Sequence, residues 1–152
     1  MKKIAFFFLL NVGLFLGLSK ASAQNYVLDK TIALPGNGGY DYVFIDQPNH
    51  TLYASHGTEV NVVDLKTETV KGTIGDMKGV HGIAVDNELN KGFISDGKAD
   101  EVIVFDIKTL AVITRISLDH KGADAIIFDP YSKRSSRLTG IAVVHVLLIP
   151  LQ

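Results

Sequence analysis

The stretch that decides the fold is IAVDNELNKGFISDGKADEVIVFDIKTLAVITRI, residues 83–116. It repeats, block by block and in the same order, the stretch VFIDQPNHTLYASHGTEVNVVDLKTETVKGTI at residues 43–74. Each copy has an aspartate after three apolar residues and a glycine 11 residues later. A third copy begins around Asp129, so that Asp46, Asp86 and Asp129 are 40 and 43 residues apart. Similarity at such a period is typical of a repeat protein.

The blocks inside each repeat predict short strands. They span four to six residues, are rich in Val, Ile, Phe, Tyr and Thr, and end at Gly, Asp, Asn or Pro. Asp64 to Thr67 and Asp106 to Thr109 predict turns, because Asp and Thr side chains bond nearby backbone groups. Four antiparallel strands per repeat of about 40–45 residues are typical of propeller blades, whereas an immunoglobulin-like sandwich has no such period. We therefore predict an all-β protein of four-stranded β-propeller blades in an incomplete ring.

The repeated motifs resemble one family in particular. The hydrophobic-Asp, Tyr/Phe-x-Ser-x-Gly and Val-x-Asp-x-Lys-Thr blocks are similar to the YVTN repeats, which are WD40-like and occur in mostly exported bacterial propellers. The resemblance covers about residues 26–134 and implies a closed ring of about seven blades. Residues 24–134 would supply two blades and the start of a third. Tyr26–Leu34 fits the fourth-strand block and is the expected closing strand, which pairs with the last blade of such a ring.

The N-terminal residues 1–23 have the pattern of a secretory signal peptide. Two lysines precede the apolar run Ile4–Leu18, and a small-x-small site predicts cleavage between Ala23 and Gln24. A membrane anchor is the alternative, but the run is shorter than the ~20 residues of a spanning helix. The expected location is therefore periplasmic or secreted, with no transmembrane span after cleavage.

Composition excludes several kinds of site. The chain of 152 residues has no cysteine, which excludes disulfides, thiolate metal sites and a cysteine nucleophile. Its net charge of −1 and the absence of a basic run predict that it does not bind nucleic acid.

Residues 135–152 break the repeat. Where a third copy needs its second strand, the chain has Ser135–Gly140, followed by the apolar segment Ile141–Ile149. One hypothesis is a frameshift near Arg134. The codons for the serine, arginine and threonine residues of Ser135–Gly140, when read one base earlier, can encode the expected second-strand block. The remaining blades would then have been replaced by an unrelated tail. The alternative is that Gly140 is a genuine turn glycine and the apolar segment a divergent third strand.

Candidate ligand residues gather in the loops of one propeller face, where strand two turns to strand three and strand four leads to the next blade. Imidazole and carboxylate donors suit a cation or a polar ligand, although polar residues also serve loops through turn bonding. His81 is the leading candidate because it enters an inner strand. We assign no catalytic residue, no cofactor and no particular metal. The candidate ligand residues are Asp41, His56, His81, Asp96 and Asp124, with His120 beside them.

These features predict a ligand- or protein-binding module of the cell envelope, a function that rests on analogy of fold. Its partner would be an envelope protein or a small polar ligand. Self-association through exposed blade edges is also expected, since blades bury their faces against neighbours. The alternatives are a lactonase-like hydrolase, a quinoprotein-related oxidoreductase propeller, or a truncated product without activity.

Overall fold

The computed structural model describes residues 26–119, 121–131, 134–139 and 142–146. The chain divides into two compact units, Met1–Thr31 and Ile32–Gln152. Of the first unit only residues 26–31 are described, and they form no helix or strand. The signal peptide predicted at residues 1–23 lies outside the described residues. Within the described part, no helix has the length and apolar character needed to cross a membrane.

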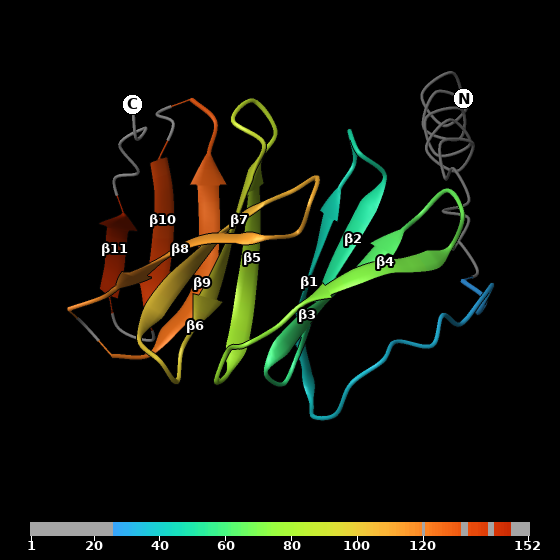
Figure 1. The fold of residues 1–152 in the computed structure, drawn as a ribbon, viewed down its shortest axis with the longest axis horizontal. Helices are drawn as coiled ribbons and strands as arrows, with labels where there is room; N and C mark the ends of the chain where they lie inside the picture. Colours follow the sequence, from blue (N-terminus) through green and yellow to red (C-terminus); the bar gives the residue numbers. More distant parts are fainter. Residues whose placement is uncertain (1–25, 120, 132–133, 140–141, 147–152) are drawn as a thin grey trace, which may run out of the picture. The chain divides into compact units, whose positions relative to one another are not determined.

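Two four-stranded antiparallel sheets form the first two blades (Figure 1). Blade 1 has the order β1-β2-β3-β4, with strands Tyr40–Asp46, Thr51–His56, Glu59–Asp64 and Thr69–Ile74. Blade 2 has the order β5-β6-β7-β8, with strands Val80–Asp86, Lys91–Asp96, Glu101–Asp106 and Val112–Ser117. The four matched blocks of each repeat are thus the four strands of one blade, which confirms the prediction of fold class.

A third sheet, blade 3, contains β9 (Ala123–Asp129), β10 (Arg134–Thr139) and β11 (Ala142–Val146) in the order β11-β10-β9. Asp129 is paired with Arg134, just as the equivalent aspartates of blades 1 and 2 are paired with the residue five positions later. The backbone of β10 therefore takes the second-strand position in the register of the other blades, and β11 takes the third. Whether a frameshift created this sequence stays a hypothesis that the gene decides.

The predicted closing strand, Tyr26–Leu34, forms no strand. Its first three residues are among the most exposed apolar residues described, with Tyr26 90% exposed. A strand needs a neighbouring edge with which to exchange hydrogen bonds. The expected neighbour is the last blade of a closed ring, and none of the three described sheets takes that place.

The Asp-x-Lys-Thr turns join the third and fourth strands of blades 1 and 2. Asp64 Oδ1 accepts hydrogen bonds from the amides of Lys66 at 2.7 Å and Thr67 at 3.0 Å. Asp106 accepts from the two equivalent amides, and also from the Thr109 hydroxyl. These backbone hydrogen bonds hold the pKa of both carboxyls below its usual value. The predicted turn chemistry is confirmed.

The core consists of two apolar layers, each between consecutive blades. Figure 1 shows the reason, since the first strands β1, β5 and β9 lie side by side and the sheets fan out from them. The layer between blades 1 and 2 contains Tyr53, Val60, Val62, Ile74, Met77, Val80, Ile83, Val85, Ile94, Ile103, Phe105 and Ile107. The layer between blades 2 and 3 contains Ala84, Phe93, Val102, Val104 and Ile126.

One cross-strand pair shows how the repeats differ without changing the fold. Leu52 lies opposite Val63 in blade 1, and Gly92 lies opposite Phe105 at the same position of blade 2. A Cβ on Gly92 would stand 2.1 Å from Cζ of Phe105, which is a severe overlap. The glycine therefore makes room for the phenyl ring, which packs against Tyr53 with 5.8 Å between ring centroids. The missing side chain on β6 is thus compensated by a larger side chain on β7, so that the core stays filled.

Candidate functional site

The first strand of every blade contains a β-bulge at the same repeat position. In blade 1 the pairing shifts between Tyr40 and Val43, so that Asp41 and its successor stand opposite one residue of β2. The equivalent shifts in blades 2 and 3 leave His81 and Asp124 as the first residues of their bulges. Because a bulge interrupts the alternation of side chains, it can aim a polar residue away from the pleat.

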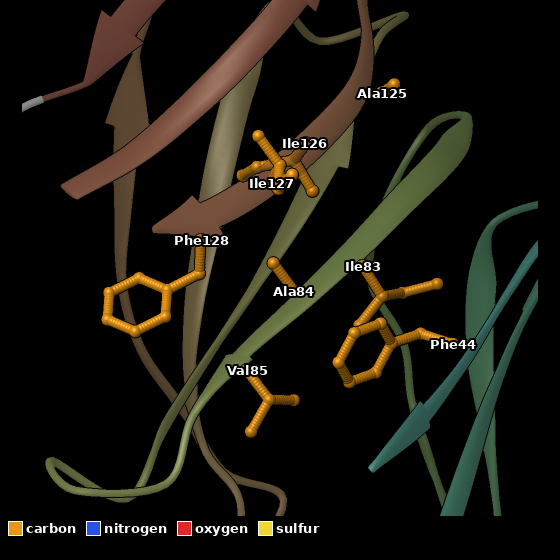
Figure 2. Close-up of a pocket in the computed structure, with 8 residues that line it drawn as sticks. All are labelled: Phe44, Ile83, Ala84, Val85, Ala125, Ile126, Ile127 and Phe128. Atoms are coloured by element: carbon orange, nitrogen blue, oxygen red, sulfur yellow. The ribbon is translucent and has the colours of Figure 1, made fainter. Parts of the chain in front are cut away.

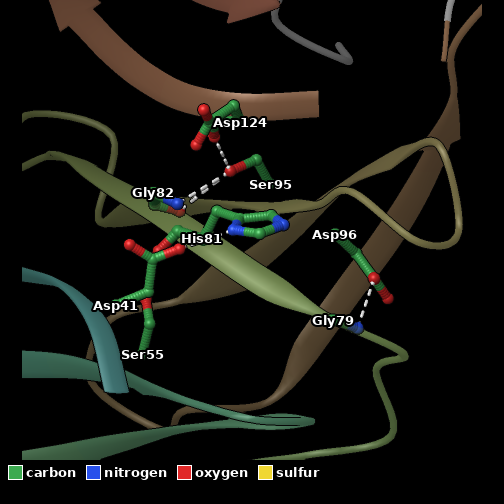
Figure 3. A network of polar contacts seen from close by, with 8 residues as sticks. All are labelled: Asp41, Ser55, Gly79, His81, Gly82, Ser95, Asp96 and Asp124. Carbon is green, nitrogen blue, oxygen red and sulfur yellow. Dashed lines mark hydrogen bonds and ion pairs between the residues drawn. The ribbon is translucent and has the colours of Figure 1, made fainter. Parts of the chain in front are cut away.

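These three bulge residues form a cluster that we call the inner-strand triad: Asp41, His81 and Asp124. One potential ligand atom from each lies within 4.8 Å of the other two. Nδ1 of His81 is 2.6 Å from Oδ2 of Asp41, which makes a hydrogen-bonded ion pair when the imidazole is protonated. The side chains of His81 and Asp41 are 35% and 43% exposed, so solvent reaches the cluster. Figure 3 shows it on three neighbouring inner strands.

Two serines hold the backbone of the triad from the neighbouring blade (Figure 3). Ser55 on β2 donates its hydroxyl hydrogen bond to the carbonyl of His81. Ser95 on β6 donates to the carbonyl of Asp124 and accepts one from the amide of Gly82, at 2.8 Å. The serine of the Tyr/Phe-x-Ser-x-Gly block thus connects its own blade to the bulge of the next. This role of the two serines is not predicted above, although their recurrence 40 residues apart in the repeat points to a structural part.

The glycine of the same block permits the close approach. A Cβ on Gly97 would lie 2.5 Å from the carbonyl oxygen of Ala123 and 2.8 Å from Nε2 of His81. Since φ at Gly97 is not in the left-handed region, crowding and not backbone conformation requires glycine here. The residue therefore lets blade 2 bring His81 against the first strand of blade 3.

The structure does not bring the other two described candidates into the triad. His56, 3% exposed, contacts the carbonyl oxygens of Pro35 and Gly38 and stacks on Tyr40, with 4.2 Å between ring centroids. Asp96, fully buried, accepts hydrogen bonds from the two amides that precede β5, at 2.7 and 2.8 Å. Both side chains hold the loop that leads into the first strand of their own blade. They therefore serve the loop through hydrogen bonds to its backbone, which is the alternative role given above for polar loop residues. His120 lies outside the described residues.

The donor set of the triad suits a hard or borderline divalent cation. Two ligands on one Ca²⁺ lie about 3.4 Å apart when adjacent and about 4.8 Å apart when opposite, for a Ca–O distance of ~2.4 Å. The triad atoms do not exceed the upper limit of that range, and the Asp41–His81 pair at 2.6 Å must open by under ~1 Å to reach its lower limit. The exposed side leaves further positions for water or a ligand. The hydroxyls of Ser55 and Ser95 are engaged with backbone carbonyls and are therefore not free to act as nucleophiles.

An apolar groove of about 450 Å³ lies further along the same three inner strands (Figure 2). Its walls come from β1, β5 and β9. The first groove residue on β1 is Phe44, three positions after Asp41, which corresponds to about 10 Å along a strand. A polar cluster followed by an apolar groove is the usual composition of a small-molecule site. The lining residues are Phe44, Ile83, Ala84, Val85, Ala125, Ile126, Ile127 and Phe128.

Comparisons with known proteins bear on the fold. The chain is similar to hydrazine synthase of Kuenenia stuttgartiensis (TM-score 0.63, 20% identity), covering 75% of this chain and 33% of that one. It is also similar to the β-propeller domain of Cps50 (Swd1) from Myceliophteria thermophila (TM-score 0.58, 13% identity), covering 77% of this chain and 41% of that one. The chain thus spans less than half the length of either structure. No protein-family profile matches the sequence, and no curated protein does. Fold and comparisons together establish that the described part of the chain is all-β and consists of WD40-like β-propeller blades in an incomplete ring.

Proposed function

We propose that this chain is a YVTN-type exported propeller protein that acts as a binding module, with the inner-strand triad as its site for a divalent cation. One observation carries the proposal: three consecutive blades each place a metal-ligand type of side chain at the same bulge position, within 4.8 Å of one another. The bulges on three adjacent inner strands bring these equivalent positions together, and all three positions hold a side chain that can ligate a cation.

The electrostatics of the triad favour a cation. Two carboxylates and one imidazole concentrate negative charge at one point, and bringing Asp41 toward Asp124 is favourable only if a positive charge lies between them. His81 supplies that charge when protonated. When it is neutral, a divalent cation can replace the proton and use the imidazole as a ligand. The polar ligand expected from the sequence would then bind through the open positions of the ion.

The cell-envelope location belongs to the proposal and is supported by the sequence. The signal-peptide pattern of residues 1–23 and the similarity of the repeats to exported bacterial propellers both favour it. Detection of the mature protein in the periplasm or medium, with Gln24 as its first residue, tests this part. Recovery of the protein with Met1 retained would contradict it.

Titration calorimetry with Ca²⁺ and with Zn²⁺ tests the site. We expect one ion per chain, and we expect His81→Gln and Asp124→Asn each to weaken its binding roughly tenfold or more. Asp119→Asn is the matched control, since Asp119 is an exposed acid of the same loop face outside the triad. Absence of binding, or equal loss in the control, would refute the cation site.

A metal-dependent hydrolase of the lactonase-like kind is the second candidate. The same convergence favours it, because hydrolysis needs a cation held by several blades with open positions for water and substrate. Lactone turnover by the ion-loaded chain that disappears in His81→Gln would select the enzyme. Ion binding without turnover selects the binding module.

A further inference from the structure

The outer flank of blade 1 has apolar residues that the same repeat buries elsewhere. Val43 and Ile45 on β1 are 59% and 52% exposed. Their counterparts one repeat later, Ile83 and Val85, are 4% and 8% exposed, because blade 1 covers them. The free side of β1 therefore has the side chains of an inter-blade interface, and no sheet among the described residues covers it.

The free flank of blade 3 shows the complementary surface. Ile127 on β9 is 60% exposed. Its counterpart on β5, Ala84, is 2% exposed and packs in the layer between blades 2 and 3. On β1 the counterpart is Phe44, which packs against the layer between blades 1 and 2. This strand position thus faces the following blade wherever one is present.

The two interfaces inside the chain define one packing rule. Phe44 packs against the layer that contains Ile83 and Val85 of the next blade. Ala84 belongs to the layer that contains Ile126, and Phe128 packs against that layer. In both interfaces the middle apolar residue of one first strand therefore shares a layer with the flanking apolar pair of the next first strand. Ile127 is the middle apolar residue of blade 3, so by the same rule it should meet a flanking apolar pair on the first strand of another blade. Val43 and Ile45 are such a pair, and both are exposed on blade 1.

We propose that the chain self-associates head to tail, with blade 3 of one copy packed on blade 1 of a second copy. The occupant is a second copy because the two exposed flanks are the missing halves of an interface that the chain already forms twice within itself. Such contact between different surfaces is heterologous, so it produces a closed ring of blades or an open chain of copies, according to whether the rotation closes. Each contact removes apolar side chains from water in the same way as the internal interfaces.

Sedimentation of the full chain over a range of concentrations tests the proposal. The wild type should increase in mass with concentration. The double variant Val43→Lys/Ile45→Lys and the single variant Ile127→Lys should each be monomeric, with dissociation constants raised roughly tenfold or more. Ile113→Lys is the matched control, because Ile113 is 47% exposed on the outer strand β8, away from both flanks, and it should associate like the wild type.

Mixing the two monomeric variants distinguishes this arrangement from non-specific adhesion. The Val43→Lys/Ile45→Lys chain keeps an intact blade 3 flank, and the Ile127→Lys chain keeps an intact blade 1 flank. Together they should form a 1:1 dimer that grows no further. A monomeric wild type, a mixture that stays monomeric, or association that persists in both variants would overturn the proposal. Every variant retains the triad, so cation binding is measured on the same samples and succeeds or fails independently.

Discussion

Replacing Ser95 by alanine tests whether the serines connect the blades and support the site. Ser95 is fully buried, and its hydroxyl accepts the hydrogen bond of the Gly82 amide and donates one to the Asp124 carbonyl. In Ser95→Ala the buried Gly82 amide is left without its partner, and the Asp124 carbonyl loses its partner at a part-buried position that water can reach. A buried polar group left unpaired costs about 1–3 kcal/mol and a lost neutral hydrogen bond about 0.5–1.5 kcal/mol, so the expected loss of unfolding free energy is about 2–4 kcal/mol.

Ser55→Ala is the matched comparison. Ser55 occupies the same position of blade 1 and is 1% exposed, and its hydroxyl donates to the His81 carbonyl. One hydrogen bond is lost in this variant, so the expected destabilisation is about 1–2 kcal/mol, roughly half that of Ser95→Ala. Urea unfolding followed by circular dichroism measures both values, with the midpoint compared at an unchanged m-value.

The same variants report on the triad. Because each serine holds the carbonyl of a triad residue, its loss should also weaken cation binding under conditions where the chain is still folded. A Ser95→Ala chain within about 0.5 kcal/mol of wild type would refute the reasoning, since that is the usual range of neutral surface substitutions. So would a Ser55→Ala chain destabilised more strongly than Ser95→Ala.

Three further predictions concern packing, an unpaired carboxylate and alkaline pH. Gly92→Leu and Phe105→Val should each destabilise the chain by about 2–4 kcal/mol. The double variant recreates the cross-strand pair of blade 1, so urea unfolding should show a loss at least ~1 kcal/mol smaller than the sum of the two single losses. A double variant whose loss equals that sum would contradict this prediction. Oδ2 of Asp86 is buried without a hydrogen-bond partner among the described residues. In blade 1 the equivalent oxygen accepts from the side-chain amide of Asn49. Leu89→Asn supplies that amide in blade 2, so the free energy of unfolding should be about 1 kcal/mol higher than in Leu89→Ala. Burial, with a lesser contribution from a neighbouring carboxylate, raises the pKa of Tyr53 to about 12. The unfolded chain loses this proton near pH 10, so the free energy of unfolding should fall as the pH rises from about 10 to about 12. Tyr53→Phe should remove that fall in unfolding curves measured over the same pH range.

The repeat alone was enough to predict the blades. Strand and turn signals are local, since each block is a short run rich in β-branched and aromatic residues, and the third-strand blocks end at an aspartate that bonds the backbone just after it, as Asp64 and Asp106 do. The third blade was harder to foresee. Residues 134–139 lack the expected motif, yet the backbone pairs in register, because a strand edge accepts any backbone that can reach it.

The candidate site was only partly accessible from sequence. Of the five candidate residues, three converge, and the other two are buried side chains that hold the loop entering their own blade. His56 and Asp96 occupy equivalent positions, and both look as polar as His81 in the sequence. Their burial follows from the preceding loop folding over each of them, and a distance along the chain does not reveal such a contact.

The amino-acid sequence by itself determined the blade, because short apolar strand blocks and turn chemistry act over a few residues. The tertiary structure decided which polar side chains meet. Asp41, His81 and Asp124 are about 40 residues apart in sequence, and only the bulges on three adjacent inner strands turn them toward one point. The stacking of blades likewise decided which apolar residues are covered, since Val43 and Ile83 are equivalent in the repeat and differ only in having a neighbour. Burial of this kind is a property of the assembled sheets and not of the repeat.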